Sequence, residues 1–304
     1  MNSTRRTGLL LALGTAGISG VAVFLNSYGV RAFGNASTYT TAKNAIAAIT
    51  LLGVVTLVAA STSGPVWTPP QRLGHWLGLA AVGVFGGAVA FLLFFEGLAR
   101  ANSVHAAFIH KTLLVWVALL AVPLLGERLG VVHAAAIALL VVGQVGLAGG
   151  TTTDFGRGEL MILGATLIWS GEVLLAKVLL SELSSWTVGL TRMSLGSLVL
   201  IGWTVGHGRG SALTHLSSKQ WGWVLLTGVI LAGYVATWFA ALSRAPAVDV
   251  TAVLVVGAVV TAVIAAVVNG VPLRPDLGWI ALLLMGAALA ALPARQDARA
   301  VSAA

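Results

Sequence analysis

The sequence contains no cysteine and little charge of either sign. Only 9% of its 304 residues are charged, with 17 Lys and Arg against 9 Asp and Glu. Without a thiol, the chain cannot form a disulfide, a thiolate metal site or a cysteine nucleophile. Soluble domains carry about 25% charged residues, so this chain has too few to cover a surface that faces water. The composition excludes an ordinary soluble enzyme, a disordered chain and a nucleic-acid-binding domain as first interpretations.

The motifs of common enzymes and nucleotide sites are also absent. The sequence has no His-Glu-x-x-His zinc motif, no Gly-x-Ser-x-Gly elbow and no Walker A loop. Three spaced glycines, Gly14, Gly17 and Gly20, lie inside an apolar run and not after a strand, so they do not form a dinucleotide fingerprint. We therefore expect neither an enzyme nor an ATP-driven pump, and no cofactor, metal ion or nucleic-acid partner.

Long apolar runs make up most of the chain. Hydrophobic residues account for 58% of it, and the mean hydropathy is +0.97. A bilayer-spanning helix needs about 20 apolar residues, and continuous runs favour helices over the alternating strands of a membrane barrel. We therefore expect an all-α integral membrane protein with ten transmembrane helices in a lipid bilayer. The runs cover approximately 8–28, 38–60, 75–98, 104–124, 130–149, 158–181, 186–205, 221–242, 248–268 and 277–293.

The two halves of the sequence resemble each other. Residues 95–101 are similar to residues 239–245, 144 positions later, and the glycine pair at 8 and 14 recurs 150 positions later at 158 and 164. This predicts two five-helix repeats, residues 1–150 and 151–304. Because five is an odd number, the second repeat enters the membrane from the opposite side, an inverted arrangement common among secondary transporters. A duplicated membrane scaffold or sensor subunit that does not transport is the alternative.

Several motifs occur in an order typical of one family. They are Phe94-Phe95-Glu96-Gly97-Leu98, Leu124-Leu125-Gly126-Glu127-Arg128-Leu129, Val142-Gly143-Gln144-Val145-Gly146 and Ile168-Trp169-Ser170. With them the chain resembles an EamA-type member of the drug/metabolite transporter superfamily, although residues 269–273 lack the acidic corner. The resemblance implies a multi-pass protein of the bacterial inner (plasma) membrane with cytoplasmic termini, and export of small metabolites such as amino acids. The distribution of basic residues gives little support to this orientation, because the implied topology places seven of them on the cytoplasmic side and six on the outer side.

Glu172 is the only acid well within a predicted span, and Trp169 lies on the same helix face. A charge at this depth costs about 2.5–3.5 kcal/mol on insertion scales, so it is expected to face a cavity or a partner. One interpretation makes Glu172 a coupling group that exchanges protons or meets a substrate amine. The other makes it the buried partner of Lys43, Lys111 or Arg192.

Six further residues are candidates for contact with a small-molecule substrate. His110 and Lys111 lie in the fourth apolar run. The family resemblance implies that this helix lines the substrate path, and as a cationic pair the two residues could hold a substrate carboxylate. Packing and structural pairing are the alternatives for both. Lys43 and Arg192, at equivalent places in the two halves, are expected to be structural, and Lys177 to reach a helix end. No oligomeric state is predicted. The expected substrate contacts are Asn26, Phe94, His110, Lys111, Trp169 and Trp238.

Overall fold

The computed structural model describes residues 3–101, 103–127, 129–147, 155–270, 273 and 276–292. Regular structure within these ranges is entirely helical, in agreement with the predicted all-α class. The elements are α1 (Ser3–Phe33), α2 (Ala36–Ser61), α3 (Leu73–Ala81), η1 (Val82–Val89), α4 (Ala90–Leu98), α5 (Ser103–Lys111), α6 (Leu113–Leu125), α7 (Val131–Leu147), α8 (Arg157–Leu179), α9 (Ser185–Gly206), α10 (Ser211–Thr214), α11 (Ser218–Leu242), α12 (Ala247–Leu254), α13 (Gly257–Asn269) and α14 (Leu277–Ala290).

Within the described residues, eight helical segments are long and apolar enough to cross a membrane. Two more apolar helices, α7 and α14, have 17 and 14 residues and are shorter than the roughly 20 residues of a typical span. Length and composition therefore support eight of the ten predicted spans, and the other two correspond to these shorter helices. Large apolar side chains lie exposed on the outside, among them Leu57 at 72% and Val131 at 88%, as expected for a surface that faces lipid.

Two of the predicted runs are interrupted helices. The run at 104–124 contains α5 and α6, which part at Thr112, and the run at 248–268 contains α12 and α13, which part after Leu254. At the first break the Thr112 hydroxyl donates to the Ile109 carbonyl at 2.6 Å. At the second, the amides of Val255 and Val256 turn to carbonyls only three residues back, which tightens the backbone and ends the α-helix. Each break lies near the middle of its run.

Polar residues fix where several of the helices begin. The side chains of Asn35 and Ser184 accept hydrogen bonds from the third amide of α2 and of α9, the usual way to satisfy the free amides of a helix start. Ser217 and Gln220 cap α11 reciprocally. Because α2 and α9 begin at equivalent caps, residues in the two helices can be matched by their distance from the cap.

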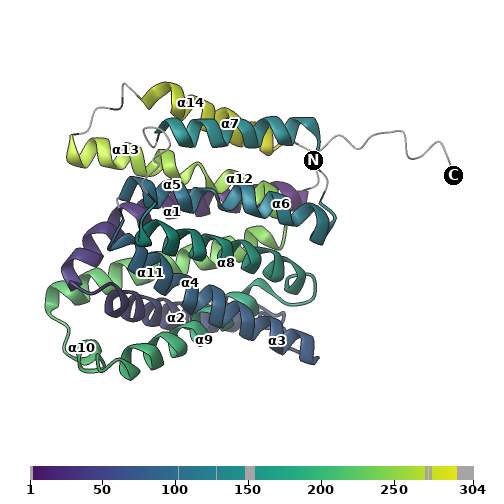
Figure 1. Ribbon diagram of the computed structural model, residues 1–304. Helices are drawn as coiled ribbons and strands as arrows, with labels where there is room; N and C mark the ends of the chain where they lie inside the picture. The colour runs from purple at the N-terminus through teal and green to yellow at the C-terminus, as the bar shows by residue number, and fades with distance from the viewer. Residues whose placement is uncertain are drawn as a thin grey trace.

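The helices lie alongside one another in one bundle (Figure 1). The pair α7 and α14 forms one edge, α3 and α9 lie toward the opposite edge, and α1, α8 and α11 run between them. The helix formed by α3, η1 and α4 packs against α8 and α9, and α11 packs against α1 and α2. The middle of the bundle is thus enclosed by helices from both halves of the sequence.

The repeat suggested by the sequence is also visible in the packing. A Cβ on Gly8 would lie 2.9 Å from Ala245 Cβ, and a Cβ on Gly158 would lie 3.0 Å from Ala101 Cβ. Gly158 lies 150 residues after Gly8, and Ala245 lies 144 residues after Ala101. The first long helix of each half therefore packs tightly against the end of the third helix of the other half.

Candidate functional site

A cavity of about 120 Å³ lies in the middle of the bundle. It is lined by residues of α1, α2, α4, α5, α6, α8, α9 and α11 and so receives side chains from both halves. The lining residues are Ser19, Ala22, Val23, Asn26, Lys43, Phe91, Phe94, Phe95, His110, Leu113, Trp169, Glu172, Val173, Arg192, Thr227, Leu231, Tyr234, Val235 and Trp238.

Many of these residues occupy equivalent positions in the two halves. Ser19, Ala22 and Val23 of α1 correspond, 150 residues later, to Trp169, Glu172 and Val173 of α8, and all six line the cavity. Lys43 and Arg192 each lie eight residues after the cap of their helix. The same helix positions therefore enclose the cavity from both halves but carry different side chains.

The structure brings most of the predicted site residues together. Asn26, Phe94, His110, Trp169 and Trp238 all line the cavity, and so does the predicted coupling residue Glu172. Lys111 does not line it. Neighbouring residues of a helix point in different directions, so the expected His110–Lys111 pair is divided between two cavities. Lys111 lines a smaller one of about 40 Å³, together with Thr112 and Gln144.

Aromatic rings form one wall of the central cavity. The centroid of the Phe94 ring lies 5.4 Å from that of Trp169, and the His110 ring lies 5.1 Å from Phe94 and 5.0 Å from Trp169. Across the cavity lining, Tyr234 and Trp238 stack with their centroids 6.0 Å apart. Rings at these separations attract one another and offer flat apolar surfaces to a ligand.

Glu172 forms a buried ion pair with Arg192. Nε of Arg192 donates to one carboxylate oxygen, and Nη2 donates to the other at 3.1 Å, with both side chains 7% exposed. Of the two interpretations of Glu172, the paired one is thus present in the structure, although the carboxylate also lines the cavity. A two-pronged bond of this kind fixes the orientation of both groups.

A π-helical segment supports the ion pair. In η1 the backbone hydrogen bonds skip one more residue than in an α-helix, as in the bond from the Ala90 amide to the Phe85 carbonyl. The Gly86 carbonyl in this segment accepts hydrogen bonds from Arg192 Nη2 at 3.1 Å and from Trp169 Nε1 at 3.0 Å. A Cβ on Gly86 would overlap the Glu172 carboxylate, so a larger residue here would displace the ion pair.

Lys43 is buried without a counter-charge among the described residues. Its Nζ lies 3.9 Å from the centroid of the Phe95 ring and within 5.6 Å of two further rings, those of Tyr39 and Phe91. Its one hydrogen bond is a long one, 3.4 Å, to Asn26 Oδ1. The side chain therefore neither bonds to backbone carbonyls nor reaches a helix end, and the structural role expected from the sequence stays a prediction. Lys177 does bond to carbonyls, those of Leu242 and Ala245.

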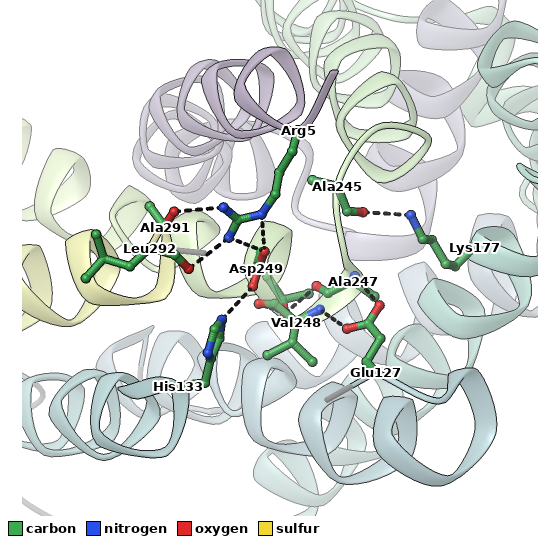
Figure 2. A network of polar contacts seen from close by, with 11 residues as sticks. Arg5, Glu127, His133, Lys177, Ala245, Ala247, Val248, Asp249, Ala291 and Leu292 are labelled. Carbon is green, nitrogen blue, oxygen red and sulfur yellow. Dashed lines mark hydrogen bonds and ion pairs between the residues drawn. The ribbon is translucent and has the colours of Figure 1, made fainter. Parts of the chain in front are cut away.

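One end of the bundle, which contains Arg5 and is called the Arg5 end, is closed by a network of polar contacts (Figure 2). Arg5 Nη2 donates to Asp249 Oδ2 at 2.7 Å, and His133 Nε2 lies 3.3 Å from Asp249 Oδ1. Arg5 also donates to the carbonyls of Ala291 and Leu292. The network joins α1, α7, α12 and the end of α14.

Glu127 extends this closure between the two halves. Its carboxylate accepts from the Ala247 amide at 2.6 Å and from the Val248 amide at 3.1 Å, at the start of α12. The turn that carries it needs Gly126, whose φ is +66°. The acidic corner of the family motif thus has a specific partner in the structure, the start of α12. Arg128 lies outside the described residues.

The opposite end, called the Tyr28 end, is joined differently. The matching turn at Gly270 has a φ of +68°, but the preceding Asn269 accepts a hydrogen bond from Tyr28 of α1 at 3.1 Å. At the Arg5 end α6 packs against α12, whereas the equivalent pair α5 and α13 makes at most marginal contact in the described residues. The packing of α6 on α12 thus joins the two halves at the Arg5 end, whereas at the Tyr28 end the halves meet through α1 and α13 and the pair α5 and α13 makes little contact.

Three polar residues of these sites are absent from the sequence-based predictions. Tyr39 donates to Asn26 Oδ1 at 2.6 Å beside the cavity, and Asp249 and His133 form the Arg5-end network. Asp249 falls at the border of the predicted run 248–268, where a charge is ordinary. Its burial, at 3% exposed, depends on helices far away in the sequence. Tyr39 could have been identified from the sequence, because it lies four residues before Lys43 and therefore on the same helix face.

The fold and the cavity together define a multi-pass membrane protein with a central polar and aromatic site. The family model described as "EamA-like transporter family" matches residues 6–149 and again 156–292, so the chain belongs to the EamA-like transporter family. This is a family of transporters and not of enzymes, in agreement with the sequence-based prediction. One crystal structure of a protein is similar in fold, with a TM-score of 0.72, 18% identity, and coverage of 96% of this chain and 98% of that one. No curated protein sequence matches the chain.

Proposed function

We propose that the protein is a secondary transporter that moves a small metabolite by alternating access. The observation that carries this proposal is the cavity at the middle of the bundle, lined from both halves at equivalent helix positions. A transporter binds its substrate at such an interface near the middle of the membrane and exposes it to each side in turn. A passive scaffold has no need of buried charges around a cavity, since each is costly within the bilayer.

The interrupted helices support the same mechanism. The breaks between α5 and α6 and between α12 and α13 lie at equivalent places, and His110 and Leu113 of the first break line the cavity. Discontinuous helices are common at transporter binding sites, because the two segments of such a helix can tilt separately. The odd number of helices in each repeat predicts that the repeats are inverted. In an inverted pair, tilting of one interrupted helix at one end of the bundle is equivalent to tilting of the other interrupted helix at the opposite end.

The contrast between the two ends indicates which state is present. The Arg5-end network and the packing of α6 on α12 close one side, and α5 and α13 make little contact on the other. In the proposed cycle α5 approaches α13 while the contacts of Glu127 and Asp249 break. We place both termini in the cytoplasm of a bacterial inner membrane, so that the Arg5 end faces the cytoplasm and the proposed opening of this state is toward the outside.

Within this cycle, Asn26, Phe94, His110, Trp169 and Trp238 contact the substrate, and Glu172 couples its movement to protons. Protonation of Glu172 would release Arg192 from its pair and change the charge of the cavity. Lys111 is left out of the binding site because it lines the second cavity. The direction we propose is export, and the sequence-based expectation for the substrate is an amino acid or a related metabolite.

Flux measurements in proteoliposomes test the proposal. The reconstituted protein is presented with labelled amino acids and related organic acids, with and without an imposed pH gradient. We expect one class of solute to accumulate with the gradient, and the Glu172→Gln variant to lose this accumulation while it stays folded.

The matched control is Glu96→Gln, since Glu96 belongs to an exposed ion pair with Arg100 outside the cavity lining. This variant should keep normal flux. Gradient-driven accumulation by folded Glu172→Gln protein would remove Glu172 from coupling. No flux of any solute by folded wild-type protein would favour a membrane scaffold or sensor subunit instead.

A further inference from the structure

The central cavity is lined by two polar side chains whose hydrogen-bonding capacity the described residues leave largely unused. Lys43 is 2% exposed, forms no ion pair with any described residue and makes one long hydrogen bond of 3.4 Å. Nδ1 of His110 is buried and has no hydrogen-bond partner among the described residues. Both side chains line the cavity. Buried polar groups in native proteins nearly always have partners, so two such side chains around one cavity point to a ligand that completes their bonding.

The charges around the cavity do not cancel. The lining contains one carboxylate and two cations, and the carboxylate, Glu172, is held by Arg192 through both of its oxygens. Lys43 is left as the uncompensated charge. An isolated buried ammonium is unfavourable, and a negative group that reached it would relieve the imbalance. A positive group would find no free acid in the lining.

The surroundings of Lys43 hold the ammonium in place without neutralising it. The centroids of three aromatic rings lie within 5.6 Å of Nζ. The Tyr39 hydroxyl donates a 2.6 Å hydrogen bond to Asn26 Oδ1, the same oxygen that Lys43 contacts. Cation–π attraction stabilises the charged form and leaves the ammonium free to donate to an acceptor. The site is therefore organised before a ligand arrives, which reduces the entropy lost on binding.

We propose that the cavity selects a small organic monoanion with a flat apolar body. Its carboxylate accepts hydrogen bonds from the Lys43 ammonium, and its apolar body lies against the Phe94 and Trp169 rings beside His110. This proposal rests on the proposed function and narrows the class of substrate. The site recognises a carboxylate, and it offers no free acid to pair with an ammonium group such as that of an amino acid. Lys43, which the sequence suggested was structural, becomes the residue that determines specificity.

Binding to the purified protein in detergent tests the proposal without transport. The probes are benzoate, 3-phenylpropanoate and 1-naphthoate, each compared by calorimetry with its neutral amide. We expect the wild-type protein to bind at least one acid about 10- to 100-fold more tightly than its amide, as for hydrogen bonds to a charged group. This comparison needs no variant, so it does not depend on whether a substituted protein folds.

Three variants assign the preference to Lys43. Lys43→Gln should remove the preference for acid over amide, and Lys43→Arg should keep part of it. The matched control is Lys111→Gln, which neutralises a buried lysine of the second cavity and should leave the preference unchanged. Equal binding of acid and amide by the wild type, a preserved preference in Lys43→Gln, or no binding of any of the three acids would overturn the proposal.

Flux measured in parallel separates this inference from the proposed function. Acids that bind through Lys43 but never cross a liposome would support the anion site and contradict transport. Amino acids that cross at the same rate with and without the Lys43→Gln substitution would support transport and contradict the anion site.

Discussion

The two halves of the protein use one pair of equivalent positions in opposite ways. In the second half, Glu172 of α8 and Arg192 of α9 neutralise each other. In the first half, the equivalent positions hold Ala22 and Lys43, so the cation is kept and the acid is absent. The comparison teaches that equivalent buried cations can differ in their partners, since Arg192 is paired with an acid and Lys43 has no ion pair with any described residue. The proposed anion site rests on this difference.

The largest expected effect comes from breaking the complete pair. Glu172→Ala leaves Arg192 buried without its counter-charge, so the free energy of unfolding should fall by about 3–5 kcal/mol. Lys43→Met, at the equivalent position of the first half, removes a cation that has no ion pair with any described residue and should cost less, about 2 kcal/mol, the cation–π contribution of a desolvated cation. Denaturation in mixed detergent micelles measures both values.

A double variant controls this prediction. Glu172→Gln combined with Arg192→Met removes both charges, and it should recover most of the stability lost by Glu172→Ala. If Lys43→Met destabilises the protein as strongly as Glu172→Ala does, the two halves do not differ in the way described.

A smaller effect is expected from the backbone that supports the pair. Gly86→Ala places a Cβ in the space of the Glu172 carboxylate, and overpacking of this kind costs about 1–3 kcal/mol. Gly74→Ala is the matched control, because the space around Gly74 in the same long helix is open. Thermal unfolding should separate the two variants, and equal unfolding temperatures would mean that the pair can move away from Gly86 freely.

The smallest effect is expected from making the halves alike. Ala22→Glu introduces an acid at the position equivalent to Glu172, where it can pair with Lys43. The affinity for an acid such as benzoate should fall about tenfold, roughly 1.4 kcal/mol, because the new carboxylate competes with the ligand for one ammonium. Calorimetry of the variant measures this change. Unaltered affinity would show that Lys43 is not the group that receives the ligand.

Much of the architecture could be predicted from the sequence, because lipid imposes strong local rules. Continuous apolar runs gave helices at the expected places, and the repeated glycines at 8 and 158 pack against equivalent partners. The breaks at Thr112 and after Leu254 could not be predicted, since neither contains proline and the second lies within uniformly apolar sequence. They follow from backbone geometry that a hydropathy pattern does not record.

The cavity was partly predictable for a related reason. Residues such as Trp169 and Glu172 lie on one helix face, so local spacing was enough to place them together. The separation of Lys111 from His110 follows from the same rule. By contrast, the partner of Glu172 was one of three possible cations, and the capping of α12 by Glu127 joins residues 120 positions apart. Such contacts depend on how distant helices pack.

The π-helix η1 has a consequence for how the two halves diverged. Phe95 and Phe239 are equivalent residues of the two repeats. The helix that leads to Phe95 begins at Leu73, and the helix that leads to Phe239 begins at Ser218, so the first of these segments is one residue longer. A π-turn absorbs an inserted residue without breaking the helix. The one-residue difference between the halves is therefore accommodated inside an unbroken helix, in the segment whose Gly86 carbonyl accepts hydrogen bonds from Arg192 and Trp169.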